Sequence, residues 1–229
     1  MGRYLEFFDE CYYINRAERQ DRSEAFIKRA FEVGILPKRQ EAVKPEFEYV
    51  KYLYEGHEDI TRAEKISCTL SHQSIIQEAK NNNYDCILIF EDDCLFLDNF
   101  KEKLSKSIFD LKNFEWDIFY LGGEPNNYLH QISDSLYTMK ERGGIYCLHA
   151  YAIHKRFYDK ILSIEANKIS ILDNYILNMS SEERKLFAPS EILAIQDYTF
   201  SDIWHYMTNS QDLMINGWNK YIKNEINSN

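Results

Sequence analysis

The run Ile87-Leu88-Ile89-Phe90 is followed directly by Glu91-Asp92-Asp93. Consecutive apolar residues of this kind are typical of a strand buried on both faces. In an open α/β sheet the carboxyl ends of the strands border the ligand crevice, so we expect the three carboxylates there. Such a cluster suits a hard divalent cation, Mg²⁺ or Mn²⁺, of the kind that binds a nucleotide diphosphate. A solvated turn or a helix cap is the alternative that the run alone leaves open.

The composition bounds the class of protein. A chain of 229 residues with 45% hydrophobic residues suits one α/β domain with a packed core. The net charge of −10 argues against extended nucleic-acid binding, because neutralising phosphates needs a basic face. No window approaches the roughly 18 apolar residues of a transmembrane helix, and the N-terminus lacks a signal-peptide pattern. We therefore expect a cytoplasmic protein, with peripheral membrane contact left open.

The cysteines predict free thiols in a reducing compartment. Their number, 5, is odd, and no two of them have the Cys-x-x-Cys spacing of a zinc or redox motif. The sequence therefore predicts no zinc site. It also contains no Gly-rich phosphate loop and no Gly-x-Gly-x-x-Gly, which removes the usual support for ATPases and dinucleotide-dependent dehydrogenases.

Strand and helix patterns alternate along most of the chain. Apolar runs predict strands at 11–14, 85–90, 116–121 and 145–153, and periodic stretches predict helices at 61–83, 100–111, 155–165 and 172–179. Residues 41–54 are expected to contain one or two further strands, and 129–137 a mobile lid. The alternation predicts an α/β fold with a largely parallel, twisted sheet flanked by helices.

Short motifs in a fixed order add a family resemblance. They are Tyr13-Ile14-Asn15-Arg16, Cys68-Thr69-Leu70-Ser71-His72, Ile89-Phe90-Glu91-Asp92-Asp93, Trp116-Asp117-Ile118-Phe119-Tyr120-Leu121-Gly122 and His149-Ala150-Tyr151-Ala152-Ile153. This order and spacing resemble glycosyltransferase family 25, over residues 10–180. The family includes bacterial lipooligosaccharide galactosyltransferases and collagen hydroxylysine galactosyltransferases.

The resemblance implies a fold, a donor and a reaction. It implies a single GT-A type domain over 1–229, with a nucleotide-sugar half at 1–122, an acceptor half at 123–215 and a polar tail at 216–229. The implied reaction moves a hexose, galactose or glucose, from a UDP-sugar to a hydroxyl group of a glycan, with inversion by direct displacement. Lipopolysaccharide biosynthesis is one such setting. A Mn²⁺ or Mg²⁺ ion would stabilise the charge on the departing diphosphate.

The same resemblance assigns roles to the acidic run and to the donor pocket. Glu91 and Asp93 are expected to bind the metal, and Asp92 to contact the donor ribose or a bound water. Asn15 and Arg16 follow the first strand, where an amide can bind a base or ribose and a guanidinium a phosphate.

Two further arginines extend the predicted donor pocket. Arg19 and Arg22 lie one helical turn apart, so both can face the phosphates. A solvated helix face, with Glu18 and Asp21 as partners, is the alternative.

Polar residues from a helix and from a later strand complete the expected pocket. Ser71 and His72 are expected to order the donor or the acidic loop from the helix before the acidic strand. His149, in a His-x-Tyr pattern with Tyr151, is expected to line the donor or acceptor pocket. A histidine packed in the core is the alternative for both histidines.

An inverting transfer needs a carboxylate base, and a metal often needs a further ligand. Asp173 matches an acidic position of the family after the His-x-Tyr segment, and Glu124, just past Gly122-Gly123, is its rival. Asp173 as a helix N-cap is the alternative. His205 is a candidate third metal ligand, with a surface histidine as the alternative.

Two other functions remain open from the sequence. One is a metal-dependent phosphohydrolase or nucleotidyltransferase that uses the same acidic cluster. The other is a noncatalytic GT-A-like domain that binds a glycan or a protein. Dependence on a UDP-sugar separates the first of these from a glycosyltransferase, and the intact acidic run argues against the second.

Overall fold

The computed structural model describes residues 5–54, 61–200, 207–208 and 210–223. The strands are β1 (Glu10–Asn15), β2 (Lys38–Glu41), β3 (Cys86–Glu91), β4 (Cys94–Phe96), β5 (Ile118–Tyr120), β6 (Glu124–Pro125), β7 (Leu129–Gln131), β8 (Leu136–Thr138), β9 (Ile145–Tyr146), β10 (Ala150–His154), β11 (Leu186–Pro189), β12 (Ala194–Gln196), β13 (Thr199–Phe200), β14 (Met207–Thr208) and β15 (Ile222–Lys223). The helices are α1 (Gln20–Glu32), α2 (Glu48–Tyr54), α3 (Arg62–Asn81), α4 (Phe100–Leu111), α5 (Tyr158–Leu162), α6 (Leu172–Asn178) and α7 (Gln211–Tyr221), with short 3₁₀ turns η2 (Lys155–Phe157) and η3 (Ala166–Lys168).

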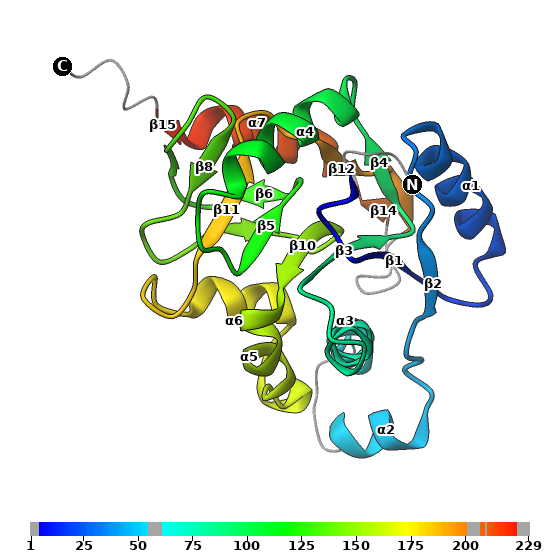
Figure 1. Cartoon of the computed structure of the whole chain (residues 1–229). Helices are drawn as coiled ribbons and strands as arrows, with labels where there is room; N and C mark the ends of the chain where they lie inside the picture. Colours follow the sequence, from blue (N-terminus) through cyan, green and yellow to red (C-terminus); the bar gives the residue numbers. More distant parts are fainter. Residues whose placement is uncertain (1–4, 55–60, 201–206, 209, 224–229) are drawn as a thin grey trace.

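A nine-stranded sheet with the order β15-β7-β8-β11-β5-β10-β3-β1-β2 forms the centre of the fold (Figure 1). Strands β2, β1 and β3 are parallel to one another, as are β11 and β5. Strand β10 runs antiparallel between β3 and β5, and β8 runs antiparallel to both of its neighbours. The α/β class predicted from the sequence is confirmed, and antiparallel β10 joins its parallel parts.

Strand β3 is buried on both faces, as its unbroken apolar run predicted. Ile87 and Ile89 belong to one hydrophobic cluster, together with residues of α3, α5 and α6. Leu88 and Phe90 belong to the opposite cluster, together with residues of α1 and α4. Side chains alternate between the faces of a strand, so one run of four residues contributes side chains to the hydrophobic clusters on both faces of the sheet. Figure 1 shows α4 and α3 on opposite sides of the sheet.

The pairing of β3 sets the position of the acidic run. Parallel β1 lies beside β3 with Ile14 opposite Glu91, so both strands end at the same edge of the sheet. Antiparallel β10 begins at that edge, and the Glu91 backbone N–H donates to the His149 carbonyl over 2.8 Å. Segments at residues 15, 91 and 149 therefore meet at the carboxyl edge, where α/β sheets bind ligands.

The prediction of strands within 41–54 is wrong. Strand β2 ends at Glu41, and the second half of the segment is helix α2. Val50 is fully buried and Leu53 packs beside it against Ile66 of α3. This spacing of three residues is helical, and Pro45 lacks the N–H that a strand would donate to its neighbour.

Two other expectations from the C-terminal half differ from the structure. Residues 129–137 form strands β7 and β8 of the central sheet, with Leu129 and Leu136 fully buried, so they are not a lid. Residues 216–223, expected in a polar tail, complete helix α7 and strand β15, and the buried Trp218 anchors them in the core. An amphipathic helix with few apolar positions leaves too weak a sequence signal to separate it from a tail.

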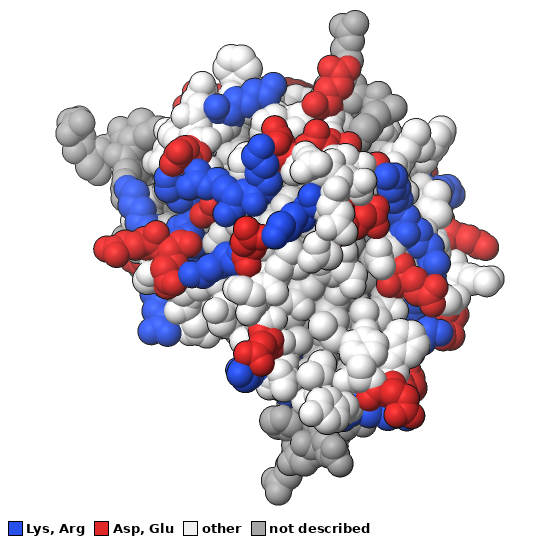
Figure 2. Space-filling view, turned by 60° about the horizontal axis from the view of Figure 1, so that its bottom comes forward, with Lys and Arg blue, Asp and Glu red and all other residues white. Residues whose placement is uncertain are grey.

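The surface in Figure 2 carries both signs of charge. Lysine and arginine side chains are interspersed with aspartate and glutamate, around a broad area without charged side chains. In the described part of the chain, no helix combines the length and apolar character needed to cross a bilayer.

Gly122, just after β5, is required by a close backbone contact. A Cβ atom at this position would lie 1.7 Å from the Ala194 carbonyl oxygen. We expect Gly122→Ala to lower the free energy of unfolding by about 3 kcal/mol or more, because backbone on both sides must move. Gly217→Ala is the control. Gly217 lies within helix α7, and its added Cβ would come no closer than 3.3 Å to a neighbouring atom, the Cδ of Pro125. Thermal denaturation of both variants tests this, and equal melting temperatures would contradict it.

Candidate active site

A cavity of about 720 Å³ opens at the carboxyl edge of the sheet. Its wall combines the ends of β1 and β3, one face of α3, strand β6 and the start of α6. Most of the residues predicted for the site line this one cavity: Asn15, Arg16, Ser71, His72, Glu91, Asp92, Asp93, Glu124 and Asp173. Residues more than 150 positions apart in the chain thus meet at one cavity.

The backbone of the acidic run is held by hydrogen bonds from neighbouring elements. Arg29 of α1 donates to the carbonyl oxygens of Asp92 and Cys94, each over 3.1 Å. The Asp197 backbone N–H donates to the Asp93 carbonyl over 2.7 Å. These bonds fix the turn between β3 and β4, and with it the directions in which the carboxylates point.

Asp92 is occupied by contacts within the protein. The Asn15 amide donates to it over 2.7 Å, and the Arg22 guanidinium lies 3.2 Å from its other oxygen. Asn15 in turn accepts a hydrogen bond from Arg39 over 2.9 Å. Burial raises the pKa of Asp92, while Arg22 and Asn15 counteract that rise. Asn15 and Asp92 therefore brace one another, which is a positioning role.

Glu91 and Asp93 place two interacting carboxyl groups in the cavity wall. Burial and the charge of Glu91 raise the pKa of Asp93 to about 8, although Arg22 lies 3.5 Å from it. Burial opposes ionisation of Glu91 too, but the contact with His72 and the charge of Arg22 outweigh it, and the pKa of Glu91 is lowered. Among the described residues the buried Asp93 Oδ1 has no hydrogen-bond partner. An orphaned carboxylate oxygen beside a second carboxylate fits a hard divalent cation.

His72 links the acidic run to β10. Its Nδ1 lies 3.1 Å from the Tyr151 hydroxyl, and its Nε2 lies 3.4 Å from Glu91 Oε1. Ser71, on the same helix, donates to a backbone carbonyl one turn earlier and accepts from the Val43 N–H over 2.9 Å. The position of His72 supports its predicted role of ordering the acidic loop, whereas Ser71 fastens the segment after β2 to α3.

Asp173 and Glu124, the two predicted bases, both line the cavity, but they differ in how firmly hydrogen bonds hold their carboxylates. The oxygens of Asp173 accept backbone N–H groups of Cys147, over 3.1 Å, and of Asn174, over 2.6 Å. Burial raises the pKa of Asp173. Within the described ranges the carboxylate of Glu124 has no hydrogen-bond or ion-pair partner, although its backbone pairs with Tyr146 of β9. Asp173 is the more firmly positioned carboxylate and Glu124 the freer one.

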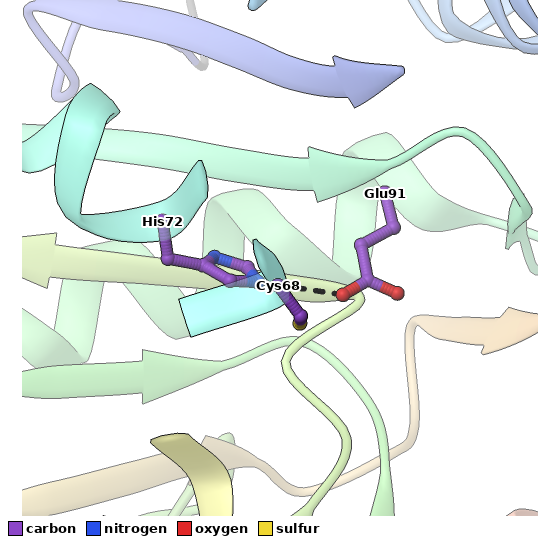
Figure 3. A group of neighbouring side chains, drawn as sticks. All are labelled: Cys68, His72 and Glu91. Carbon is purple, nitrogen blue, oxygen red and sulfur yellow. Dashed lines mark hydrogen bonds and ion pairs between the residues drawn. The ribbon is translucent and has the colours of Figure 1, made fainter. Parts of the chain in front are cut away.

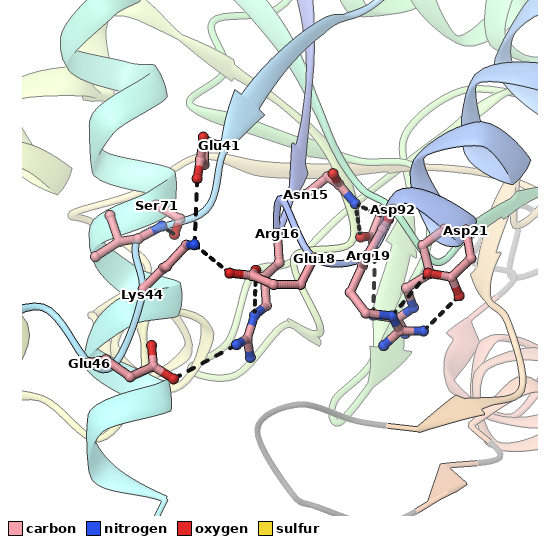
Figure 4. A network of polar contacts seen from close by, with 12 residues as sticks. Asn15, Arg16, Glu18, Arg19, Asp21, Glu41, Lys44, Glu46, Ser71 and Asp92 are labelled. Atoms are coloured by element: carbon pink, nitrogen blue, oxygen red, sulfur yellow. Dashed lines mark hydrogen bonds and ion pairs between the residues drawn. The ribbon is translucent and has the colours of Figure 1, made fainter.

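Arg16 reaches the cavity from the end of β1 through a loose ion-pair network (Figure 4). Its guanidinium lies 3.9 Å from Glu18 and 4.0 Å from Glu46. Lys44 pairs with the same Glu18. Contacts of about 4 Å at a partly exposed arginine are weak, so the side chain can turn to an anionic ligand at small cost.

Two predicted site residues, His149 and Arg19, do not line this cavity, and a third falls outside the described part of the chain. His149 is completely buried, and burial lowers the pKa of its ring to about 4, so the ring is neutral at pH 7. Arg19 pairs with Asp21 over 3.2 Å, whereas the guanidinium of Arg22 lies 3.2 Å from Asp92 of the acidic run. His205 lies outside the described residues.

Two residues at the site, Arg29 beside the acidic run and Cys68 in the cavity wall, had no assigned role in the sequence analysis. Arg29 acts on backbone carbonyls, and such contacts leave no sequence motif, although it follows Arg22 by two turns on the same face of α1. Cys68 lies one turn before His72 on α3, and this spacing of four residues was the available signal.

Arg29 is expected to act as a positioning residue. We expect Arg29→Ala to lower kcat/KM of the reaction at this site by about 10- to 100-fold, because the turn that aims the carboxylates loses two donors. Arg29→Lys should retain only part of the wild-type kcat/KM, since one ammonium lacks the forked geometry of the guanidinium. Lys28→Ala, an exposed neighbour on the same helix, is the control. Steady-state kinetics of the three variants, with melting temperatures, test this, and an Arg29→Ala enzyme that matches Lys28→Ala would exclude the role.

The chain belongs to glycosyltransferase family 25. The family model described as "Glycosyltransferase family 25 (LPS biosynthesis protein)" matches residues 6–169, most of the chain. Procollagen galactosyltransferase 1-B of Xenopus laevis is 26% identical over 253 residues, which cover 90% of this chain and 40% of that protein. Inactive glycosyltransferase 25 family member 3 of Mus musculus is 28% identical over 173 residues, which cover 68% of this chain and 29% of that protein. The chain thus spans less than half the length of these relatives.

A solved structure with a similar arrangement is UDP-glucose pyrophosphorylase complexed with UDP-glucose. Its TM-score is 0.46 at 7% identity, covering 79% of this chain and 89% of that one.

Proposed function

We propose that this chain is a metal-dependent, inverting glycosyltransferase that moves a hexose, galactose or glucose, from a UDP-sugar to a hydroxyl group of a glycan acceptor. Membership of glycosyltransferase family 25 supports the reaction class. The observation that carries the proposal is the joint placement of Glu91 and Asp93, with an orphaned Asp93 oxygen, in the wall of a cavity large enough for a nucleotide-sugar. The galactosyltransferase relative supports a galactose donor.

The proposed metal is Mn²⁺ or Mg²⁺, held by Glu91 and Asp93, where it would offset charge on the departing diphosphate. The protein's own residues act around it. Arg22 and Asn15 keep Asp92 in place, Arg29 fixes the backbone of the run, and Arg16 can contact a diphosphate oxygen.

In the proposed displacement, the acceptor hydroxyl attacks the anomeric carbon on the face opposite to the diphosphate. The new bond from oxygen to carbon forms as the bond to the diphosphate oxygen breaks. The hydroxyl proton passes to a carboxylate, for which Asp173 is our first choice and Glu124 the second. A buried carboxyl with a raised pKa is a stronger base when ionised than an exposed one, which favours Asp173.

Turnover with defined donors tests the proposal. We expect release of UDP from UDP-galactose or UDP-glucose to depend on a glycan acceptor and on Mn²⁺, and to stop with EDTA. The product should have the anomeric configuration opposite to that of the donor, as read by NMR. Release of phosphate without transfer would indicate the phosphohydrolase alternative. Nucleotide binding without turnover would indicate a noncatalytic member, as the mouse relative's name describes for that protein.

A further inference from the structure

We infer that Cys68, His72 and Glu91 form a second metal site, an open three-ligand site for a borderline-soft transition-metal ion such as Zn²⁺. The three side chains converge at one side of the cavity (Figure 3). One ligand atom from each residue lies within 4.8 Å of the other two. Two of the ligands come from consecutive turns of the rigid helix α3 and the third from the end of β3.

The distances are close to those that a tetrahedral zinc ion requires. Zinc bonds of about 2.0–2.2 Å to nitrogen and oxygen place two such ligands about 3.3 Å apart. His72 Nε2 and Glu91 Oε1 are 3.4 Å apart. A zinc–sulfur bond of about 2.3 Å places sulfur about 3.6 Å from the nitrogen. The Cys68 sulfur lies within 4.8 Å of the other two ligand atoms, so it needs to move inward by no more than about 1 Å. A rotation of this short side chain supplies that movement.

The surroundings of His72 favour metal binding through Nε2. Its Nδ1 lies 3.1 Å from the hydroxyl of the buried Tyr151, whose oxygen can accept a hydrogen bond from the Nδ1–H group. The lone pair of Nε2 then faces Glu91 and the cavity. An outer hydrogen bond of this kind fixes the tautomer and the orientation of metal-binding histidines. The position left for a fourth ligand faces the cavity, as in zinc sites that keep a water or a substrate atom.

The donor set differs in kind from that of the proposed catalytic metal. Glu91 and Asp93 offer only oxygen, which suits Mg²⁺ or Mn²⁺, whereas a thiolate and an imidazole select zinc or cobalt. Because Glu91 belongs to both sets, an ion held by Cys68 and His72 draws Glu91 away from Asp93. Zinc is therefore expected to inhibit the transferase, a consequence that rests on the proposed function, whereas the site itself does not.

Cobalt titration of the metal-free protein tests the site directly. We expect Co²⁺ to produce the near-ultraviolet charge-transfer absorption of a cobalt thiolate, and Zn²⁺ to displace it. Cys68→Ser should abolish the band and weaken Zn²⁺ binding at least about 100-fold. Cys147→Ser is the matched control, because Cys147 lines the same cavity but lies outside the cluster. The cobalt band of Cys147→Ser should be the same as that of the wild-type protein.

A separate variant distinguishes failure of this site from failure of the proposed function. Asp93→Asn leaves all three ligands in place, so it should keep the cobalt band while losing Mn²⁺-dependent UDP binding. The absence of a band in the wild-type protein, or a band that survives in Cys68→Ser, would overturn the site whatever the turnover assays show. If the site holds, Cys68→Ser should also relieve inhibition of UDP-sugar turnover by Zn²⁺.

Discussion

Asp93→Asn is expected to reduce UDP-sugar turnover by about 100- to 1000-fold or more while making the metal-free protein more stable. Turnover falls because the proposed metal loses a charged ligand. Stability rises because Asp93 is a buried carboxyl crowded by Glu91. An asparagine fills the same space without a charge to desolvate. A residue that lowers stability in the absence of its ligand is typical of a functional site.

The stability effect has a defined pH dependence. The pKa of Asp93 is about 8 in the folded protein, above its ordinary value of 3.8, so the folded state holds a proton that the unfolded state releases. Its contribution to stability is thus complete below about pH 4 and is lost as the pH rises toward 8. One proton corresponds to a slope of about 1.4 kcal/mol per pH unit.

Denaturation of the metal-free protein across this pH range checks the expectation. Asp93→Asn should unfold at higher denaturant concentration than wild type at pH 8, with a smaller difference at pH 5. Asp98→Asn, an exposed aspartate near the same run, is the control and should behave as wild type. An Asp93→Asn protein that is less stable than wild type at pH 8 would contradict the described charge distribution.

Asp173→Asn is expected to lower kcat by about 100- to 10,000-fold with little change in KM for the UDP-sugar, because an amide cannot take the acceptor proton. Asparagine keeps one oxygen to accept a backbone N–H of Cys147 or Asn174, so the fold should survive. Glu124→Gln, in the same cavity wall, should lower kcat by less than about tenfold.

The pH profile of kcat separates a base from a structural carboxylate. A base must be ionised, so wild-type kcat should rise as the pH passes the raised pKa of Asp173, and this rise should vanish in Asp173→Asn. The reverse pattern, with Glu124→Gln the slower variant, would assign the base to Glu124. Retained activity in both variants would contradict both assignments.

The sequence predicted the parts of the site that depend on strand ends. The run at 87–90 fixed a doubly buried strand, and its register with β1 brought Asn15 beside Asp92. Contacts that a side chain makes with residues far away in the sequence were not predictable from sequence patterns. Arg29 reaches the Asp92 carbonyl, and Arg22 bridges the side chains of Asp92 and Asp93.

The failed predictions also have physical causes. In α2, aromatic residues with high strand propensity surround Val50 and Leu53, whose packing on α3 outweighs that propensity. Strands β7 and β8 have only three residues each, too few to show an alternating pattern. Short elements are specified by their sheet neighbours, which a single sequence does not display.

Calorimetric titration of UDP into the wild-type chain, once with Mn²⁺ and once with EDTA, tests most directly whether the carboxylate cavity is a metal-dependent nucleotide site. We expect saturable binding with Mn²⁺ that weakens at least about tenfold with EDTA, because the diphosphate then faces Glu91 and Asp93 without a cation between them. Equal affinity in both conditions, or no binding in either, would contradict the account.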